Sequence, residues 1–156
     1  MSAAGKWKCY EQFKLEFGEA GLDLTAGTFN MALYLSTSNA NTLSVSKAKA
    51  DLTNEVANAN GYVTGGVALT GVTWTNAAGT ETLASGNGVW TAAGGPITAR
   101  FAVLYKVGTF LAIVNPIICV SLLDTAPADV SVADGQQLSV TINAAGVFTL
   151  SGATVD

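Results

Sequence analysis

Residues 97–108, ITARFAVLYKVG, alternate between two sets of side chains. The first set is wholly apolar and comprises Ile97, Ala99, Phe101, Val103 and Tyr105. The second set is mixed and comprises Thr98, Arg100, Ala102, Leu104 and Lys106. Because successive side chains of a strand point to opposite faces, this period of two predicts a strand with one buried face. The pattern places Arg100, the only arginine in the chain, on the outer face with Thr98 and Lys106.

Further strands are predicted from residue 27 onward. The segments are 27–36, 67–77 with a bulge at Gly71, a short strand around 89–90, 110–123 as a central strand or strand pair bent or ended at Pro116, and a hairpin over 137–152 that turns at 143–146. Between them, residues 44–57 predict a loop with one or two helical turns capped by Ser44 or Ser46, and residues 59–66 predict a turn. About seven short strands with Gly and Asn turns predict a mainly β fold, an antiparallel β-sandwich or barrel.

Residues 6–20 predict a short N-terminal amphipathic helix. Its aromatic side chains recur at three- and four-residue steps, which places them on one stripe: Trp7, Tyr10, Phe13 and Phe17. We expect this stripe to pack on the sheet and to cover one open side of it. A length of 156 residues predicts a single domain spanning 1–156.

The composition limits the classes of partner. Charged residues make up 12% of the chain, against roughly 25% in an ordinary domain, and hydrophobic residues make up 49%. Two interpretations stay open: a compact domain with a Ser/Thr/Asn/Gly surface, or a subunit largely covered by neighbours. Seven basic residues against eleven acids provide no cationic face, so we expect no nucleic-acid binding. The longest apolar stretch, 110–123, is too short to cross a membrane, and with no apolar leader we expect cytoplasmic synthesis.

The two cysteines, Cys9 and Cys119, lie far apart in a chain without histidine. Structural zinc sites use clusters of Cys and His, so we expect no zinc and no other cofactor. Two alternatives remain for the cysteines: two buried free thiols, or a disulfide within or between chains.

No pattern in the sequence indicates an enzyme. There is no histidine for acid–base work, no GxSxG elbow and no phosphate-binding glycine loop. Asp124, Asp129 and Asp134 do not match a calcium loop, so ordinary turns are favoured over a cation site. For Arg100, an internal pair with an acid and an intersubunit pair both stay open.

Four segments carry a resemblance to a known family. They are the aromatic helix and first strand at 10–36, the block "NEV…GY…GG" within 52–74, the block "ITARFAVLYK" within 89–106, and the closing segment 138–152. Their order resembles a family of small structural proteins of tailed bacteriophages, encoded among head and tail morphogenesis genes. The second and third blocks are the specific part. The apolar richness of 110–123 and the two cysteines depart from the family pattern.

The resemblance implies a β-rich virion protein without catalytic residues, made in the host cytoplasm and located in the virion. The implied function is a capsid decoration (cement) or minor capsid protein that binds the outer shell. Its partners would be the major capsid protein and neighbouring virion subunits, in a homo-oligomer or on the lattice, with Arg100, Cys9 and Cys119 as candidate intersubunit contacts. Two alternatives remain: a tail, neck or fibre component, and a carbohydrate- or receptor-binding module that stacks ligands on Trp74, Trp90 or Tyr62.

Overall fold

The computed structural model describes residues 5–19, 22–44, 46–126 and 129–151. The fold is mainly β, with 40% of residues in strands and 8% in helices, and every strand pairing is antiparallel. A sandwich-like β fold agrees with these sheets, so the predicted fold class is confirmed. The described residues form fourteen strands rather than about seven, because long predicted strands are interrupted and several strands are only two residues long.

A five-stranded sheet forms the centre of the molecule. Its strands, in spatial order, are β1 (Lys8–Cys9), β11 (Ile117–Leu122), β8 (Phe101–Lys106), β2 (Phe29–Tyr34) and β3 (Val67–Ala68). β8 and β11 lie inside this sheet and carry almost wholly buried side chains on both faces. A strand that is apolar on both faces is stable only where both faces are covered, so these two strands form the middle of the core.

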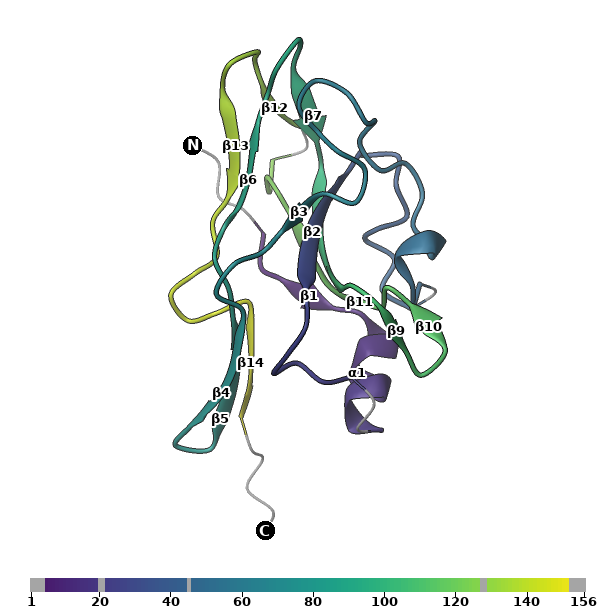
Figure 1. The fold of residues 1–156 in the computed structure, drawn as a ribbon, viewed down its shortest axis with the longest axis vertical. Helices are drawn as coiled ribbons and strands as arrows, with labels where there is room; N and C mark the ends of the chain where they lie inside the picture. Colours follow the sequence, from purple (N-terminus) through teal and green to yellow (C-terminus); the bar gives the residue numbers. More distant parts are fainter. Residues whose placement is uncertain (1–4, 20–21, 45, 127–128, 152–156) are drawn as a thin grey trace.

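Shorter sheets lie beside the central one. They pair β4 (Thr73–Ala77) with β5 (Thr80–Ala84) and β5 with β14 (Phe148–Ser151), β6 (Gly88–Thr91) with β13 (Gln137–Val140), β7 (Ile97–Ala99) with β12 (Val130–Val132), and β9 (Thr109–Phe110) with β10 (Ile113–Val114). In Figure 1, β4, β5, β6, β13 and β14 follow one side of the molecule, while α1 and the β9–β10 hairpin lie on the other side. Leu83, Trp90 and Leu138 of these sheets join the same buried cluster as Met31 and Ile118 of the central sheet.

The helix is shorter than the sequence pattern predicts. α1 spans Glu11–Gly18, and the preceding residues Lys8–Cys9 form β1 instead. Tyr10 at the N-cap has extended backbone angles, and its N–H donates to the carbonyl of Ile118. Because Lys8–Cys9 pair with β11, the chain is extended up to Tyr10, and the helix that the aromatic spacing predicts from residue 6 begins only at Glu11. The predicted end of the helix, residue 20, lies outside the described residues.

The predicted C-terminal hairpin over 137–152 is wrong in its pairing. β13 pairs with β6, and β14 pairs with β5, so the two segments never pair with each other. Residue 152 itself lies outside the described residues. β13 alternates as predicted, with Leu138 and Val140 buried, whereas β14 does not alternate and leaves Leu150 exposed. Alternation reports only which face is buried and contains no information on the partner strand.

Three other segments differ from their prediction. Residues 67–77 split into β3 and β4, which belong to different sheets, with Gly71 at a φ of 60° between them. Neither β5 nor β12 was predicted, since β12 falls in a segment assigned to turns. The helical turn expected in 44–57 is a 3₁₀ helix, Lys49–Asp51. The Asp51 carboxylate, rather than a serine, caps it by accepting hydrogen bonds from the N–H groups of Lys47 and Ala48 just before the helix.

Lys106 does not lie on an outer face. Its side chain is only 2% exposed, its ammonium donates to the carbonyl of Asp23, and it lies 4.5 Å from the ring centroid of Phe110. Burial lowers the pKa of Lys106, and the nearby Asp23 charge opposes that shift. The outer-face prediction is wrong here because Asp23 and Phe110, from segments before and after β8, contact the ammonium on the side that alternation alone leaves open.

Candidate functional site

Hydrogen bonds around Glu55 and Gly65 join the two specific motif blocks. Oε1 accepts hydrogen bonds from the Tyr62 hydroxyl at 2.7 Å and from the Gly65 N–H at 2.5 Å. Oε2 forms an ion pair with Lys49 at 2.5 Å. The Tyr105 hydroxyl, from the other block, donates to the Gly65 carbonyl at 2.7 Å. The blocks that carry the family resemblance thus form one hydrogen-bonded network.

The Tyr62 hydroxyl also joins this network to the central sheet. It accepts a hydrogen bond from the N–H of Leu33 in β2 at 3.0 Å. Burial raises the pKa of Tyr62 well above its ordinary value, and the neighbouring Glu55 carboxylate adds to the shift. The phenol therefore stays neutral and serves as both donor and acceptor.

Gly66 shows why this block needs glycine. Its φ is 72°, and a Cβ built there would lie 1.8 Å from the carbonyl oxygen of Met31. Only a residue without a side chain allows the backbone to approach β2 so closely. Both carboxylate oxygens of Glu55 are already engaged with donors, so the arrangement fits a structural clamp rather than an acid–base centre.

Arg100 lies at the break between β7 and β8. Its Nη1 donates to the carbonyl of Ala126 at 2.7 Å, and its own backbone N–H donates to the carbonyl of Tyr34 at 2.7 Å. The observed contact is therefore internal and ties the segment after β11 to the sheet. The intersubunit contact predicted for Arg100 stays a prediction.

Cys9 and Cys119 are both free thiols and lie on adjacent strands. They face each other directly in the register of β1 and β11, with Cys119 fully buried and Cys9 half-buried. Sequence reasoning could not bring them together, since 109 intervening positions separate two residues that no spacing motif links. Their predicted intersubunit contact also stays a prediction.

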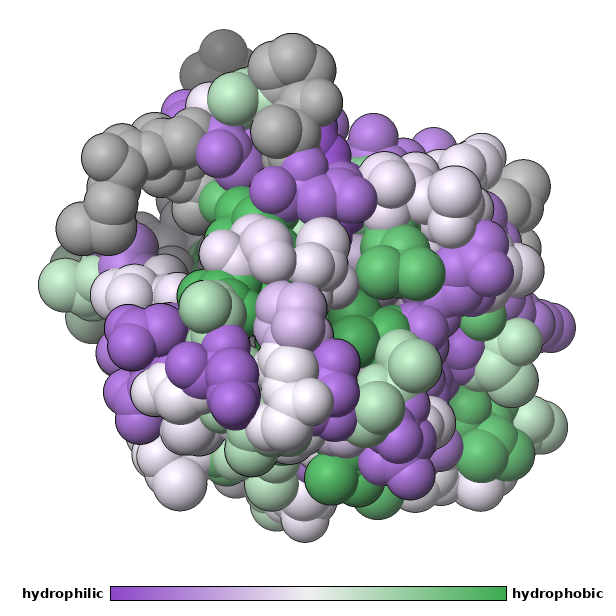
Figure 2. All heavy atoms as spheres, turned by 90° about the horizontal axis from the view of Figure 1, so that it is seen from above, coloured by the Kyte–Doolittle hydropathy of each residue, from purple (hydrophilic) through white to green (hydrophobic). Residues whose placement is uncertain are grey.

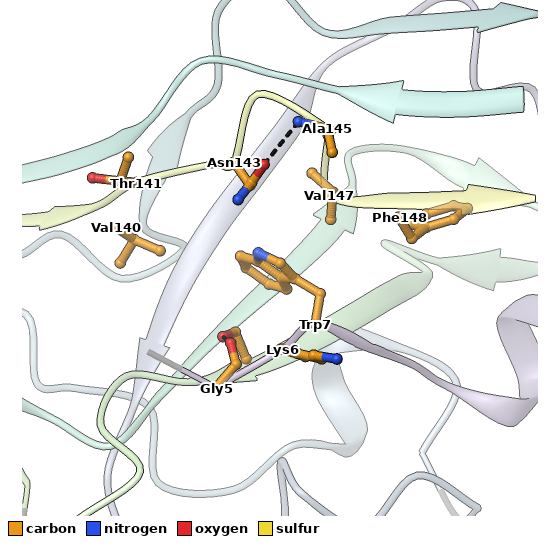
Figure 3. A pocket seen from close by; sticks show the side chains of 11 residues that line it. Gly5, Lys6, Trp7, Val140, Thr141, Asn143, Ala145, Val147 and Phe148 are labelled. Carbon is orange, nitrogen blue, oxygen red and sulfur yellow. Dashed lines mark hydrogen bonds between the residues drawn. The ribbon is translucent and has the colours of Figure 1, made fainter. Parts of the chain in front are cut away.

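A groove of about 510 Å³ lies between the N-terminal segment and the loop that joins β13 to β14. Figure 3 shows the Trp7 ring projecting toward Asn143 and Val147 across this groove. The Asn143 side chain accepts a hydrogen bond from the N–H of Ala145 at 2.8 Å, which shapes the loop. Trp7, predicted as part of the helical stripe, lines this groove instead.

The β9–β10 hairpin presents apolar side chains to solvent. The exposed fractions are 40% for Val107, 48% for Leu111 and 58% for Val114. By contrast, Figure 2 views the molecule from above, where hydrophilic and neutral side chains surround small, separate apolar patches. No periodicity singled out this hairpin, because its strands are only two residues long.

The hairpin turn has an unusual composition for its geometry. Leu111 and Ala112 form the two-residue turn, since Phe110 pairs with Ile113, and both have positive φ of 48° and 63°. Such a turn ordinarily favours Asn-Gly, because residues with bulky side chains are strained at positive φ. A leucine at this position is strained by its positive φ and leaves about half of its surface exposed.

The other candidate residues do not assemble into sites. Asp124, Asp129 and Asp134 accept hydrogen bonds from three different groups, the Ala126 N–H, the Ser36 hydroxyl and the Gly94 N–H. Among the described residues, no group of three or more Cys, Asp or Glu side chains could hold a metal ion. The three carboxylates thus bond to three separate segments of the fold.

Two of the three aromatic residues proposed as stacking platforms are buried, and the third is half-buried. Tyr62 and Trp90 are buried, with their ring centroids 6.4 Å apart. Trp74 is half-buried and packs edge-on to Phe17 at 5.5 Å. The prediction of a stacking platform on Tyr62 and Trp90 is wrong, because the core buries both rings. A ligand-binding role of the partly exposed Trp74 stays a prediction.

Comparison with known proteins found no matching family model, no matching curated protein and no matching solved structure. Within the described residues, no helix has the length and apolar character needed to cross a membrane.

Proposed function

We propose that this chain is a structural protein of a tailed-bacteriophage virion, a decoration or minor capsid protein that binds the outer shell. The β9–β10 hairpin docks on the major capsid protein. The observation that carries the proposal is the exposed Leu111-Ala112 turn, where backbone geometry favours Asn-Gly and the chain has an apolar pair instead. Strained, exposed apolar residues indicate a function outside the isolated fold.

The hairpin is held in place before any partner binds. The Asn115 side chain accepts a hydrogen bond from the Gly108 N–H at 2.9 Å, and the Asn115 carbonyl accepts one from the Lys49 N–H at 2.9 Å. Ile113 is buried beneath the turn. A preorganised protrusion loses little conformational entropy on docking, which favours attachment through a small apolar contact.

The resemblance at 52–74 and 89–106 supports the virion assignment. Those two blocks supply Glu55, Tyr62 and Tyr105 of the network. Lys49, which forms the ion pair with Glu55, donates its backbone N–H to Asn115 at the base of the hairpin. Low charge and an apolar excess fit a subunit covered on several sides by neighbours.

The first test measures the copy number of the chain, relative to the major capsid protein, in purified virions of the phage that encodes it. A copy number comparable with that of the major capsid protein is expected for a decoration protein. A copy number far below it would overturn shell decoration in favour of the tail, neck or fibre alternative. Absence of the chain from virions would overturn the virion assignment altogether.

The second test replaces the turn. The double variant Leu111→Asn, Ala112→Gly should fold with equal or higher stability, because its residues suit the positive φ values. Its binding to particles assembled without the chain should weaken by about tenfold or more. Val63→Asn, which alters a separate side chain that is 62% exposed, serves as the matched control and should bind normally. Full binding by the turn variant would contradict docking through the hairpin.

A further inference from the structure

The two cysteines of the chain occupy directly opposite positions on neighbouring strands. In the pairing of β1 with β11, Lys8 faces Val120 and Cys9 faces Cys119. Directly opposed side chains of an antiparallel pair project from the same face of the sheet. The two sulfur atoms therefore lie on one face, side by side.

The hydrogen bonding shows which kind of pair the cysteines form. The Tyr10 N–H donates to the Ile118 carbonyl at 3.1 Å, so the next pair along the ladder is the hydrogen-bonded one. Because the two kinds alternate, Cys9 and Cys119 form a non-hydrogen-bonded pair, in which Cα atoms lie about 4.5 Å apart. Disulfides span Cα separations of about 4.4–6.8 Å, so a bond requires only rotation of the side chains.

The surroundings of the two thiols differ. Cys119 is fully buried, whereas Cys9 lies on the edge strand and keeps part of its surface exposed. Burial raises the pKa of Cys9, and the Lys14 ammonium of α1 opposes the shift. Burial raises the pKa of Cys119 much further, and the proximity of Cys9 adds to it. Cys9 is therefore the thiol that meets an external oxidant first.

We propose that Cys9 and Cys119 form an intrachain cross-strand disulfide when the protein meets a low-molecular-weight disulfide such as oxidised glutathione. The bond locks the N-terminal edge strand β1 to the buried strand β11. Reduced surroundings leave both thiols free, so the lock closes only after the protein leaves a reducing compartment.

The reaction proceeds by two exchanges. The Cys9 thiolate attacks one sulfur of oxidised glutathione, forming a mixed disulfide and releasing one glutathione thiolate. Cys119 then loses its proton to solvent and attacks the Cys9 sulfur, releasing the second glutathione thiolate. The two cysteines lose two electrons and two protons in total, and the glutathione disulfide gains them.

The bond closes a loop from residue 9 to residue 119, which includes most of the strands. Cross-linking such a long loop restricts the unfolded chain, so oxidation should raise the melting temperature by about 10 °C. On its N-terminal side, the bond would hold β1, a two-residue strand at the edge of the central sheet.

The test treats the folded, reduced protein with oxidised glutathione and then blocks remaining thiols under denaturing conditions. We expect no free thiol, a mass lower by two hydrogen atoms, a linked peptide containing Cys9 and Cys119, and a monomer on a non-reducing gel. Two free thiols after prolonged oxidation would overturn the proposal. A disulfide-linked dimer through Cys9 would also overturn it, in favour of a crosslink between subunits.

Two variants separate the roles of the cysteines. Cys119→Ala removes the second nucleophile, so the Cys9–glutathione mixed disulfide should accumulate and appear as one glutathione adduct. Cys9→Ser leaves only the buried thiol, which should remain unmodified while the protein is folded. Each variant is first compared with the reduced wild type by circular dichroism, and neither should gain thermal stability on oxidation. A similar gain in either variant would contradict the disulfide as its cause.

Discussion

The carboxylate of Glu55 contacts three groups: it accepts hydrogen bonds from the Tyr62 hydroxyl and the Gly65 N–H, and it forms an ion pair with Lys49. In Glu55→Gln, an N–H₂ group takes the place of one carboxylate oxygen. This new donor faces either the Lys49 ammonium or the Tyr62 and Gly65 donors. We expect Glu55→Gln to lower the free energy of unfolding by about 2 kcal/mol, because partly buried donors lose their acceptor. Urea denaturation monitored by circular dichroism measures the change.

Glu81 provides the matched control for that substitution. It accepts one exposed hydrogen bond, from Asn76 at 2.6 Å. Glu81→Gln should change stability by less than about 0.5 kcal/mol. Equal losses in the two variants would show that the Glu55 network does not stabilise the fold beyond an ordinary surface contact.

Glu16 makes stability depend on pH in the opposite direction to most carboxylates. Its side chain is 2% exposed, and within the described chain Oε1 has no hydrogen-bond partner. Burial raises the pKa of Glu16 above its ordinary value of 4.5, against the opposing effects of Gln12 and Lys47. The folded state therefore binds this proton more tightly than the unfolded chain does.

The Glu16 contribution to stability is thus fully present below pH 4.5 and is lost as the pH rises through the folded-state pKa. Glu16→Gln should be more stable than the wild type at neutral pH, by about 1 kcal/mol, and equal to it in acid. Thermal melts across this pH range measure the difference. Glu11→Gln should be neutral or slightly destabilising, since an acid favours the first helical turn. A stability loss in Glu16→Gln at neutral pH would contradict the assignment.

At the scale of elements, Gly66 sets the distance between β3 and β2. A Cβ at Gly66 would overlap the Met31 carbonyl, whereas nothing lies within 4 Å of a Cβ at Gly71, whose φ of 60° is similar. Gly71→Ala should lower the free energy of unfolding by about 1 kcal/mol, because alanine is disfavoured in the left-handed backbone conformation. Gly66→Ala should lower the free energy of unfolding by about 3 kcal/mol or more, because β2 and β3 must also move apart. Equal costs in urea denaturation would show that backbone approach is not the reason for glycine.

Elements also differ in how far the sequence predicts them. The alternation of 97–108 predicts a strand, and β7 and β8 lie there with Arg100 at the break. The helical spacing of the N-terminal aromatics predicts α1 but not its start, because pairing with β11 extends residues 8–9. β12 alternates over only three residues, Val130–Val132, and β5 has four half-buried positions out of five, so neither gives a clear strand pattern.

At the scale of the whole molecule, one core joins all the sheets. Trp90 of β6 and half-buried Trp74 of β4 pack with residues of the central sheet. We therefore expect unfolding in urea to be a single transition, with tryptophan fluorescence and far-ultraviolet circular dichroism coinciding. A fluorescence transition at lower urea would show instead that the short sheets unfold before the central one.

The candidate sites belong to this scale as well. The motif residues Glu55, Gly66 and Tyr105 were visible in the sequence, but their meeting point was not, and neither was the opposition of Cys9 and Cys119. The exposed Leu111-Ala112 turn could not be predicted from the sequence, because strands of two residues are too short to show a periodic pattern.

The sequence by itself determined the fold class, the apolar strands at the centre and the packing of the aromatic helix on the core. These follow from local periodicity, because a side chain reports which face of its own segment is buried. Only the tertiary structure decided which strands pair, including the pairing of β13 with β6 and of β14 with β5, and which polar side chains contact one another. Backbone hydrogen-bonding groups are the same in every strand, so the choice of partner depends on how all the segments pack together.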